Sequence, residues 1–160
     1  MIKKKITGHP KNLILDLDGV FTDGKIYYTK DGKIMKVFGP DDHEAINSIK
    51  HLLNIHVVTA DSKGFKISEK RIRYDMGLKI DLVDSIDRLN WIKERFRLDE
   101  TIYMGDGIWD FLVFDKVLYS ISTSNALKPT KVKADYVTEY TGGERAVAEA
   151  ILHIREKFFF

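Results

Sequence analysis

The sequence predicts an α/β protein with a Rossmann-like, doubly wound parallel sheet and helices on both faces. Short apolar runs alternate with segments of helical periodicity along most of the chain, as in strands joined by helices. The first run, from Leu13 to Leu17, is rich in large aliphatic residues, which is typical of a strand buried on both faces. The 160 residues are 44% hydrophobic and 31% charged, so we expect one domain, 1–160, with a single core.

The expected elements follow in chain order. A first strand over 12–16 leads to a β-hairpin over 24–38, where alternating residues flank a "KDGK" turn. Asp41 or Asp42 is the expected N-cap of the helix that comes next. Further strands are expected at 55–60, 80–83, 101–106 and 117–122, and helices at 41–53, 63–77, 85–97, 108–116 and 144–157.

Composition excludes several classes of function. With 26 basic and 24 acidic residues, the net charge of +2 gives no electrostatic reason to expect binding to nucleic acid or to an anionic membrane. The absence of cysteine excludes disulfides, thiolate catalysis and zinc–thiolate sites. The basic start, "MIKKKITGHPKN", is not followed by an apolar run, and no segment approaches the ~18 apolar residues of a membrane span. We therefore expect a cytoplasmic protein.

Polar residues cluster where the predicted strands end. Asp16 and Asp18 end the first strand, although Asp is depleted in strands, and Thr59 ends the second. Asp106 ends the strand "TIYMGD", and Asp110 follows four residues later. Because ligands of parallel sheets bind beyond the carboxyl ends of the strands, these five side chains predict one site.

These residue types suit phosphoryl transfer. Carboxylates from two strands can hold Mg²⁺, one carboxylate can attack phosphorus, and a second can move the proton. A Thr hydroxyl and nearby backbone amides can bind phosphoryl oxygens. Taken singly, D-x-D is more often a turn or cap, "GDG" a loop, and Asp110 an acid favoured by a helix N-terminus. The combination, from three strand ends at one edge, favours an active site.

Three segments carry a resemblance to a known superfamily. "DLDGVFTDG", "VVTA" and "YMGDGIWD" resemble the first, second and fourth motifs of the haloacid dehalogenase phosphatases. "KVFGPDDHEAI" and "ADYVTEYTGGERAVAEAI" resemble its small capless branch, which includes phosphatases of octulosonate 8-phosphate and of acylneuraminate 9-phosphates. The C-terminal domain of some acylneuraminate cytidylyltransferases belongs to the same branch. The resemblance covers roughly residues 12–155.

The resemblance implies a role for each strand-end residue. Asp16 would be the nucleophile and a metal ligand, and Asp18 the general acid/base, with its backbone carbonyl on the metal. Asp106 would be the third protein ligand of Mg²⁺, and Asp110 would support the metal site without binding the ion itself. Thr59 would bind the phosphoryl group. The implied activity is Mg²⁺-dependent hydrolysis of a small phosphorylated sugar acid through an aspartyl-phosphate.

Three departures qualify this resemblance. The second motif continues as Ala60 and Asp61 in place of the family's Gly-Arg, so an acid replaces an arginine that could contact substrate, although Ala60 stays a candidate substrate contact. Arg88 stands where the third motif has Lys, so the positive charge is kept but is carried by a planar, forked guanidinium. The alternative interpretation is that Arg88 is an ordinary solvated charge on a helix. Gly107 replaces a commoner Asp.

These departures leave a second hypothesis open, a catalytically weak module for oligomerisation or regulation like the cytidylyltransferase domain. A phosphoacceptor receiver domain is disfavoured, because receivers carry the phosphorylated Asp on the third strand.

No insertion is long enough for a cap domain, and the resemblance implies a homotetramer whose neighbours cover each site. Tyr27, Tyr28, Ile34 and Met35 of the hairpin could form such contacts or pack on their own sheet. Arg145 is the candidate substrate contact supplied from a C-terminal segment (144–160). Lys36 and His43 are weaker candidates, expected at the surface. The aromatic tail "KFFF" is expected to dock on the last helix or on a neighbour.

Overall fold

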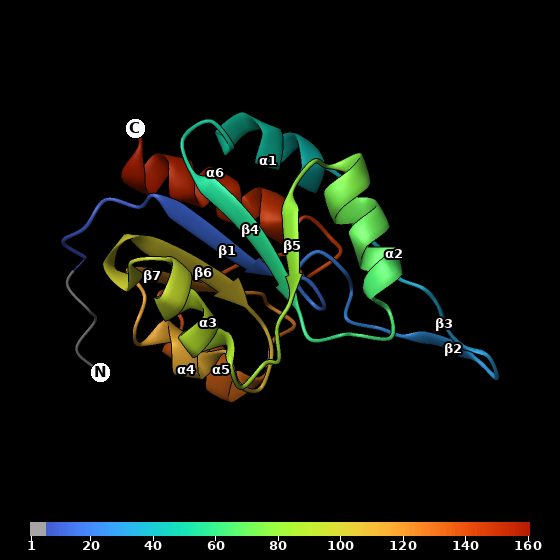
Figure 1. The fold of residues 1–160 in the computed structure, drawn as a ribbon. Helices are drawn as coiled ribbons and strands as arrows, with labels where there is room; N and C mark the ends of the chain where they lie inside the picture. Colours follow the sequence, from blue (N-terminus) through green and yellow to red (C-terminus); the bar gives the residue numbers. More distant parts are fainter. Residues whose placement is uncertain (1–5) are drawn as a thin grey trace.

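A six-stranded parallel sheet forms the centre of the protein, in the order β5-β4-β1-β6-β7-β8 (Figure 1). The structure is a computed structural model that describes residues 6–160. The strands are β1 (Asn12–Asp16), β4 (Asn54–Thr59), β5 (Lys79–Leu82), β6 (Thr101–Gly105), β7 (Tyr119–Ser122) and β8 (Tyr136–Val137). The expected fold class is confirmed.

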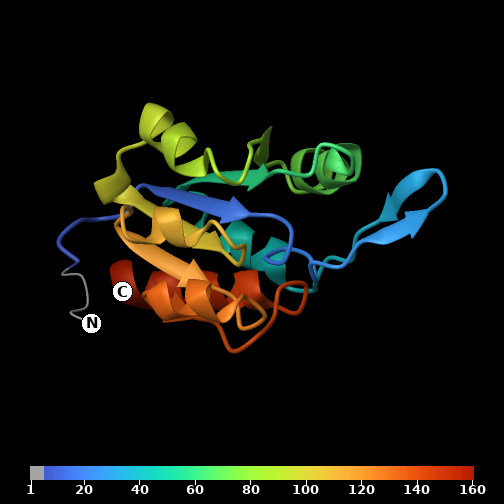
Figure 2. The ribbon, with the colours of Figure 1, turned by 90° about the horizontal axis from the view of Figure 1, so that it is seen from below.

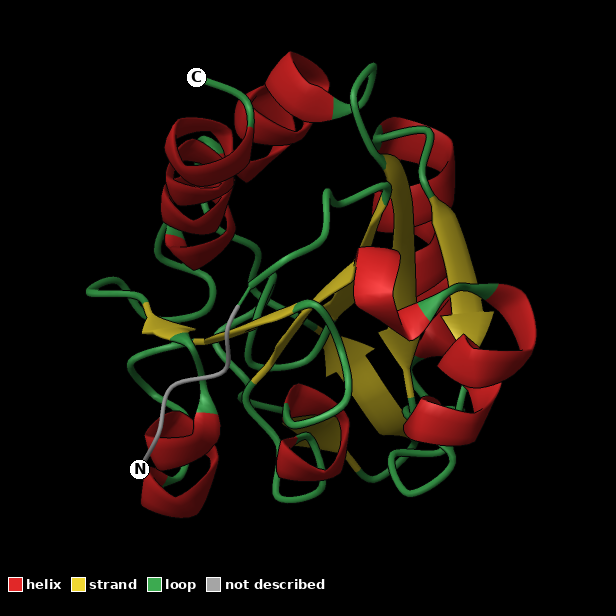
Figure 3. Ribbon diagram, turned by 90° about the vertical axis from the view of Figure 1, so that its left-hand side faces the viewer, coloured by secondary structure: helices red, strands yellow, loops and turns green. Residues whose placement is uncertain are grey.

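Helices cover both faces of the sheet (Figures 1 and 3). Leu13 and Leu15 of β1 pack in one core with residues of α1 and α6, whereas Ile14 points into a second core with residues of α3 and α4. This alternation explains why the first strand is apolar throughout. The helices are α1 (Asp42–Ile49), α2 (Phe65–Glu69), α3 (Arg88–Arg95), α4 (Phe111–Phe114), α5 (Lys128–Lys133) and α6 (Ala146–Phe158).

Two helices differ from the expectation. The helix expected over 108–116 is reduced to α4, because the turn before it folds round Asp110, whose carboxylate accepts a hydrogen bond from the backbone of Gly107. The helix expected over 63–77 is α2 continued by a π-helical segment, Lys70–Asp75, that brings Ile72 into the core. The short helix α5, with a proline in its first turn, was not expected.

The hairpin pairs β2 (Tyr27–Thr29) with β3 (Gly32–Met35) and projects away from the rest of the fold (Figure 2). Its apolar side chains do not pack on the sheet of their own chain: Tyr28 is 58% exposed and Ile34 57%. In the described part of the chain no inserted domain covers the strand ends, so the hairpin is the only projecting flap there.

The C-terminal tail docks largely on its own chain, at the end of the molecule opposite the hairpin (Figure 1). Phe158 packs edge-on against Tyr119, and Phe159 against His9, with ring centroids 5.5 and 5.3 Å apart. Phe160 remains 85% exposed. Of the basic N-terminal segment, residues 1–5 lie outside the described residues. None of the helices in residues 6–160 has the length and apolar character of a membrane span.

Asp42 does not cap its own helix. Of the two expected candidates, Asp41 occupies the N-cap position of α1, but in a left-handed conformation and without a capping hydrogen bond from its side chain. The Asp42 carboxylate instead accepts a hydrogen bond from the backbone N–H of Ala148, in the first turn of α6. It thus satisfies a free N–H at the start of the neighbouring helix. Burial raises the pKa of Asp42 to about 6.

We expect Asp42→Asn to change the pH dependence of stability. Folding raises the pKa of Asp42 from 3.8 to about 6. The carboxyl group therefore destabilises the folded protein increasingly as pH rises between these two values, and the full destabilisation persists at higher pH. The amide oxygen can still accept from Ala148. The gain in unfolding free energy of Asp42→Asn over wild type should grow by on the order of 2 kcal/mol between about pH 4 and about pH 7.5.

Urea unfolding at the two pH values measures this difference. Asp31→Asn, at the exposed hairpin turn, controls for neutralising an aspartate. A gain for Asp42→Asn that is the same at both pH values would contradict the assignment.

Candidate active site

The functional side chains predicted from the sequence meet at the carboxyl ends of the three adjacent strands β4, β1 and β6. Asp16 is the last residue of β1 and Thr59 the last of β4, while Asp106 follows β6 directly. A pocket of about 320 Å³ opens there. It is lined by Asp16, Asp18, Gly24, Ile26, Lys33, Ala60, Asp61, Ser85, Arg88, Asp106, Gly107, Ile108, Trp109 and Asp110.

Three carboxylates lie together at the base of this pocket. One oxygen each of Asp16, Asp106 and Asp110 falls within 4.8 Å of the others. Burial, with the charge of Asp110, raises the pKa of Asp16 to about 6 although Arg88 opposes this, and burial with the charge of Asp16 raises the pKa of Asp106 to about 8. The buried Oδ1 of Asp106 has no hydrogen-bond partner. Like charges gathered round an unpartnered oxygen suit a hard divalent cation, which prefers oxygen ligands.

Glycine is required where the loop after β1 meets this cluster. Gly19 has φ +85°, and a Cβ at this position would lie 2.0 Å from Oδ2 of Asp106. Its carbonyl accepts hydrogen bonds from Thr123 and Asn125, 3.3 and 3.2 Å away, which hold the loop from the β7 side. The glycine of "LDLDG" is therefore required because the backbone passes close to the Asp106 carboxylate, so the motif is defined by this glycine as well as by its two aspartates.

Arg88 balances the cluster from α3. Its side chain is 4% exposed, and its Nη2 lies 2.9 Å from Oδ1 of Asp16, while Nη1 lies 3.1 Å from Oδ1 of Asp110. Although burial opposes a charged guanidinium, Asp16, Tyr103 and Asp110 raise the pKa of Arg88. The alternative of a solvated helix charge is wrong. The structure places Arg88 against the predicted nucleophile, with the forked geometry that lets one cation contact two carboxylates.

Sequence reasoning missed Tyr103. This residue lies within β6, where an aromatic side chain is ordinary, and its ring is fully buried. Its hydroxyl donates to Oδ1 of Asp110 over 2.6 Å and accepts from Arg88 over 2.9 Å. Nothing in the strand pattern distinguishes it from a core tyrosine, because its role depends on two residues that only the fold brings near.

The carboxylate of Asp18 is bound by partners outside the cluster of Asp16, Asp106 and Asp110. Its Oδ1 accepts a hydrogen bond from Lys36 at 2.7 Å, and its Oδ2 accepts one from the Thr59 hydroxyl at 2.8 Å. The Thr59 hydroxyl also accepts from the backbone of Asp61. The expectation that Lys36 is a surface residue is wrong, since its side chain is 2% exposed.

Asp61, the acid in place of the family's arginine, is paired with two lysines. Burial opposes its ionisation, but hydrogen bonds from Lys33 and Lys36 lower the pKa of Asp61 to about 2. Arg145 and His43 do not line the pocket of their own chain. Arg145 is exposed and forms an ion pair with Asp41.

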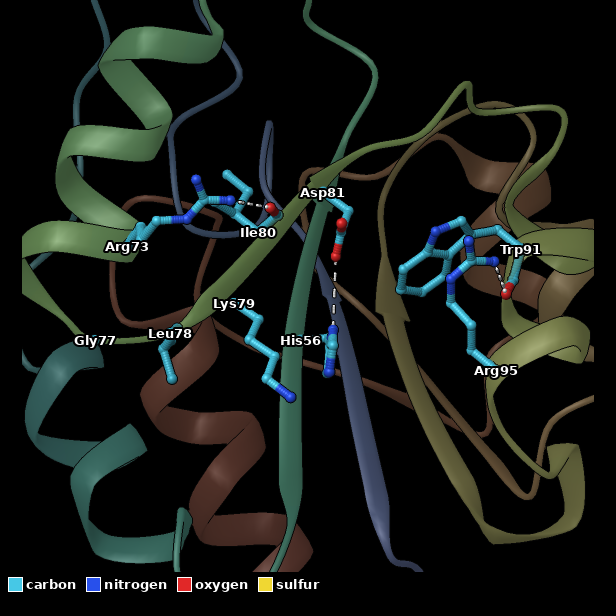
Figure 4. Close-up of a pocket in the computed structure, with 9 residues that line it drawn as sticks. All are labelled: His56, Arg73, Gly77, Leu78, Lys79, Ile80, Asp81, Trp91 and Arg95. Carbon is cyan, nitrogen blue, oxygen red and sulfur yellow. Dashed lines mark hydrogen bonds and ion pairs between the residues drawn. The ribbon is translucent and has the colours of Figure 1, made fainter.

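A larger hollow of about 580 Å³ lies away from the carboxylates, over β4, β5 and α3 (Figure 4). Two of its arginines have partners within the chain, since Arg73 donates to the carbonyl of Ile80 and Arg95 to that of Trp91. The buried Nδ1 of His56 has no hydrogen-bond partner and lies 3.7 Å from a carboxylate oxygen of Asp81. Burial, together with Lys79, lowers the pKa of His56. The acidic cluster is not part of this hollow, so the smaller pocket is the candidate active site.

The sheet order, the absence of an inserted domain over the strand ends in residues 6–160, and the carboxylate cluster together define a capless α/β fold of the haloacid dehalogenase type. Comparison with family models finds no match. The 3-deoxy-D-manno-octulosonate 8-phosphate phosphatase KdsC of Salmonella typhi is 32% identical over 143 residues, which cover 86% of this chain and 74% of that protein. The chain is therefore a phosphatase of this superfamily and belongs to the KdsC family.

Solved structures agree with this assignment. The corresponding phosphatase of Moraxella catarrhalis, in complex with magnesium ion, phosphate ion and KDO, is 25% identical with a TM-score of 0.80, covering 92% of this chain and 87% of that one. The cobalt-bound enzyme of Haemophilus influenzae matches with a TM-score of 0.79 over 92% of this chain and 88% of that one. At 24% identity, the latter supports the fold alone.

Replacing Arg88 by methionine tests the charge balance of the site. Arg88→Met would leave Asp16 and Asp110 buried without their cation, and we expect it to lower the free energy of unfolding by about 3 kcal/mol or more. Arg95→Met, at the exposed end of the same helix, should cost less than about 1 kcal/mol. Urea unfolding of both variants makes the comparison, and equal costs would contradict a structural role for the buried pair.

Proposed function

We propose that this protein hydrolyses the phosphate monoester of a small sugar acid, of the octulosonate 8-phosphate or nonulosonate 9-phosphate type, with Mg²⁺ and through an aspartyl-phosphate. The observation that carries the proposal is the position of Asp16: a buried carboxylate at a strand end, 2.9 Å from Arg88 and beside Asp106. The names of the relatives support the substrate class. The magnesium in the Moraxella complex supports the metal.

The residues present fit a magnesium ion. Asp16 and Asp106 would supply carboxylate ligands from the end of β1 and the loop after β6, and the backbone carbonyl of Asp18 would be a further ligand. Asp110, whose oxygens accept hydrogen bonds from Tyr103, Arg88 and the backbone of Gly107, would support the site without binding the ion itself. The unpartnered Oδ1 of Asp106 is the kind of buried acceptor that a cation would satisfy. When bound, Mg²⁺ would offset the negative charge shared by the carboxylates and the incoming phosphate.

In the proposed reaction, an Asp16 oxygen attacks phosphorus as the bond from phosphorus to the sugar oxygen breaks. The sugar oxygen takes the proton carried by the Asp18 carboxyl and leaves as an alcohol. Water then attacks the aspartyl-phosphate and gives a proton to Asp18, and the bond from phosphorus to Asp16 breaks to release phosphate. Arg88 holds Asp16 in place throughout, from 2.9 Å, and the backbone at Ala60 lines the pocket beside the phosphoryl position.

The site is open in the single chain, and we include a homotetramer in the proposal. Closing a site excludes water and completes its groups, and a capless chain can achieve this with a neighbour. The exposed Tyr27, Tyr28, Ile34 and Met35 of the hairpin are the proposed contact surface. Arg145, which lies outside the pocket of its own chain, would then face the site of a neighbour.

One observation favours the second hypothesis, a catalytically weak module. Asp61 stands where the resemblance expects an arginine and is neutralised by Lys33 and Lys36. That position therefore offers no free cation to a substrate carboxylate. The same activity assay separates the two functions.

We expect rapid phosphate release from at least one sugar-acid phosphate in the presence of Mg²⁺. The panel holds octulosonate 8-phosphate, several nonulosonate 9-phosphates and neutral hexose phosphates. Asp16→Asn should lower kcat by more than about 10³-fold, because it removes the nucleophile. EDTA should abolish release, and added Mg²⁺ should restore it.

Glu94→Gln, on the exposed side of α3, is the matched control and should keep wild-type rates. Release from neutral sugars only would contradict the substrate class. No release from any ester, in a folded protein, would favour the weak module.

The hairpin surface is tested by assembly state. Tyr28→Lys combined with Ile34→Lys places two charges on side chains that are 58% and 57% exposed in the single chain. We expect the double variant to run as a smaller species than the wild type in light scattering coupled to size exclusion, with unchanged thermal stability of the subunit. Leu152→Lys, an exposed residue of α6, is the control. A wild-type protein that is already monomeric would contradict the tetramer.

A further inference from the structure

Lys36 is a buried cation that the proposed reaction does not use. It follows β3 at the base of the hairpin, and its side chain is only 2% exposed. Lys36 donates hydrogen bonds to Asp18 at 2.7 Å and to Ser68 at 2.9 Å, and its nitrogen forms an ion pair with Oδ2 of Asp61 at 2.9 Å. A buried ammonium is costly unless it is fully paired, so this arrangement fixes where its nitrogen lies.

The surrounding loop is shaped to bring these partners together. A Cβ at Gly64 would lie 2.2 Å from Oδ2 of Asp61 and 3.0 Å from Cε of Lys36, so only glycine allows their close approach. The backbone N–H of Gly64 donates to Asp61, and the Ser68 hydroxyl, at 2.9 Å from the Lys36 nitrogen, also lies 3.3 Å from the carbonyl of Gly64. The loop between β4 and α2, together with Ser68 of α2, thus fixes the position of the Lys36 side chain.

Asp18 lies between this buried network and the pocket. Its side chain is 36% exposed and lines the pocket, whereas Lys36 does not. Lys36 and Thr59 each contact one oxygen of the Asp18 carboxyl group. Since a carboxylate oxygen offers two lone pairs, these anchors leave room on each oxygen for the proton that the reaction transfers.

We infer that Lys36 is a positioning residue that holds Asp18 in place for proton transfer to the leaving oxygen, and that Asp61 and Ser68 in turn hold Lys36. This inference rests on the proposed role of Asp18 but not on the identity of the sugar. It also assigns a purpose to Asp61, which lines the pocket: the acid fixes a lysine of the chain itself. Because Lys36 lies at the base of the hairpin and donates a hydrogen bond to Asp18, it links the hairpin directly to the proposed proton-transfer group.

The dependence of rate on the leaving group tests this inference. An alkyl phosphate needs a proton on its leaving oxygen, whereas p-nitrophenyl phosphate releases a stable anion without one. Lys36→Met should lower kcat by about 10²-fold on the alkyl phosphate that the wild type hydrolyses fastest. The pre-steady-state burst of p-nitrophenol, which reports attack by Asp16, should change by less than about threefold.

Two further variants keep the test decisive. Lys33→Met, on β3 three residues before Lys36, removes a partner of Asp61 that does not contact Asp18, so it should change the rates on both substrates by the same factor. Ser68→Ala removes one acceptor of Lys36 and should give the same selective loss, roughly threefold to tenfold, even if Lys36→Met fails to fold. A purely structural role would not discriminate between leaving groups.

Equal losses on the two substrates, or no loss on either, would overturn the inference. The alkyl ester used in this test is the one that the wild type hydrolyses fastest, whatever its sugar. If the substrate is not a sugar-acid phosphate, the substrate panel shows this separately, and only the choice of ester changes here.

Discussion

The gathering of three carboxylates, two buried and one half-buried, at one edge of the sheet is the constraint on which the rest of the site depends. Asp16, Asp106 and Asp110 repel one another in a poorly hydrated setting, which is why the pKa values of Asp16 and Asp106 are raised. Arg88 offsets part of this electrostatic repulsion, and the backbone N–H groups that donate to Asp16 and Asp110 offset a further part. The rigid, fully buried β1 holds Asp16 in place while the fold tolerates the remaining repulsion.

A second cation serves the other aspartate of the D-x-D pair. Arg88 contacts Asp16 from α3, and Lys36 contacts Asp18 from the hairpin base, so each carboxylate has its own buried partner. The two partners differ in kind. A planar guanidinium bridges two carboxylates, whereas an ammonium sits among three separate acceptors. The separation suits two aspartates that are proposed to attack phosphorus and to move a proton.

Local sequence patterns predicted five of the six sheet strands, the hairpin and the strand-end acids, because periodicity and turn residues act over a few positions; β8 was not predicted. They failed where a tertiary contact replaced a local one. Asp41 or Asp42 was expected to cap α1; Asp41 holds the N-cap position without a side-chain hydrogen bond, and Asp42 accepts one from α6 instead. The helix after Asp110 is shortened because the Asp110 carboxylate accepts a hydrogen bond from Gly107 in the preceding turn. Lys36 looked like a surface residue because its partners lie in segments distant along the chain.

The sequence by itself determined the order of most strands and helices, although not α5 and β8, the presence of two acids at the end of a buried strand, and the absence of an inserted cap domain. These follow from hydrophobic spacing and segment length, which the chain carries locally. Only the tertiary structure decided which cation meets which carboxylate, and that Tyr103 and Ser68 take part. The physical reason is that buried charges must be paired, and their partners come from whichever elements the packing of the sheet brings within hydrogen-bond distance.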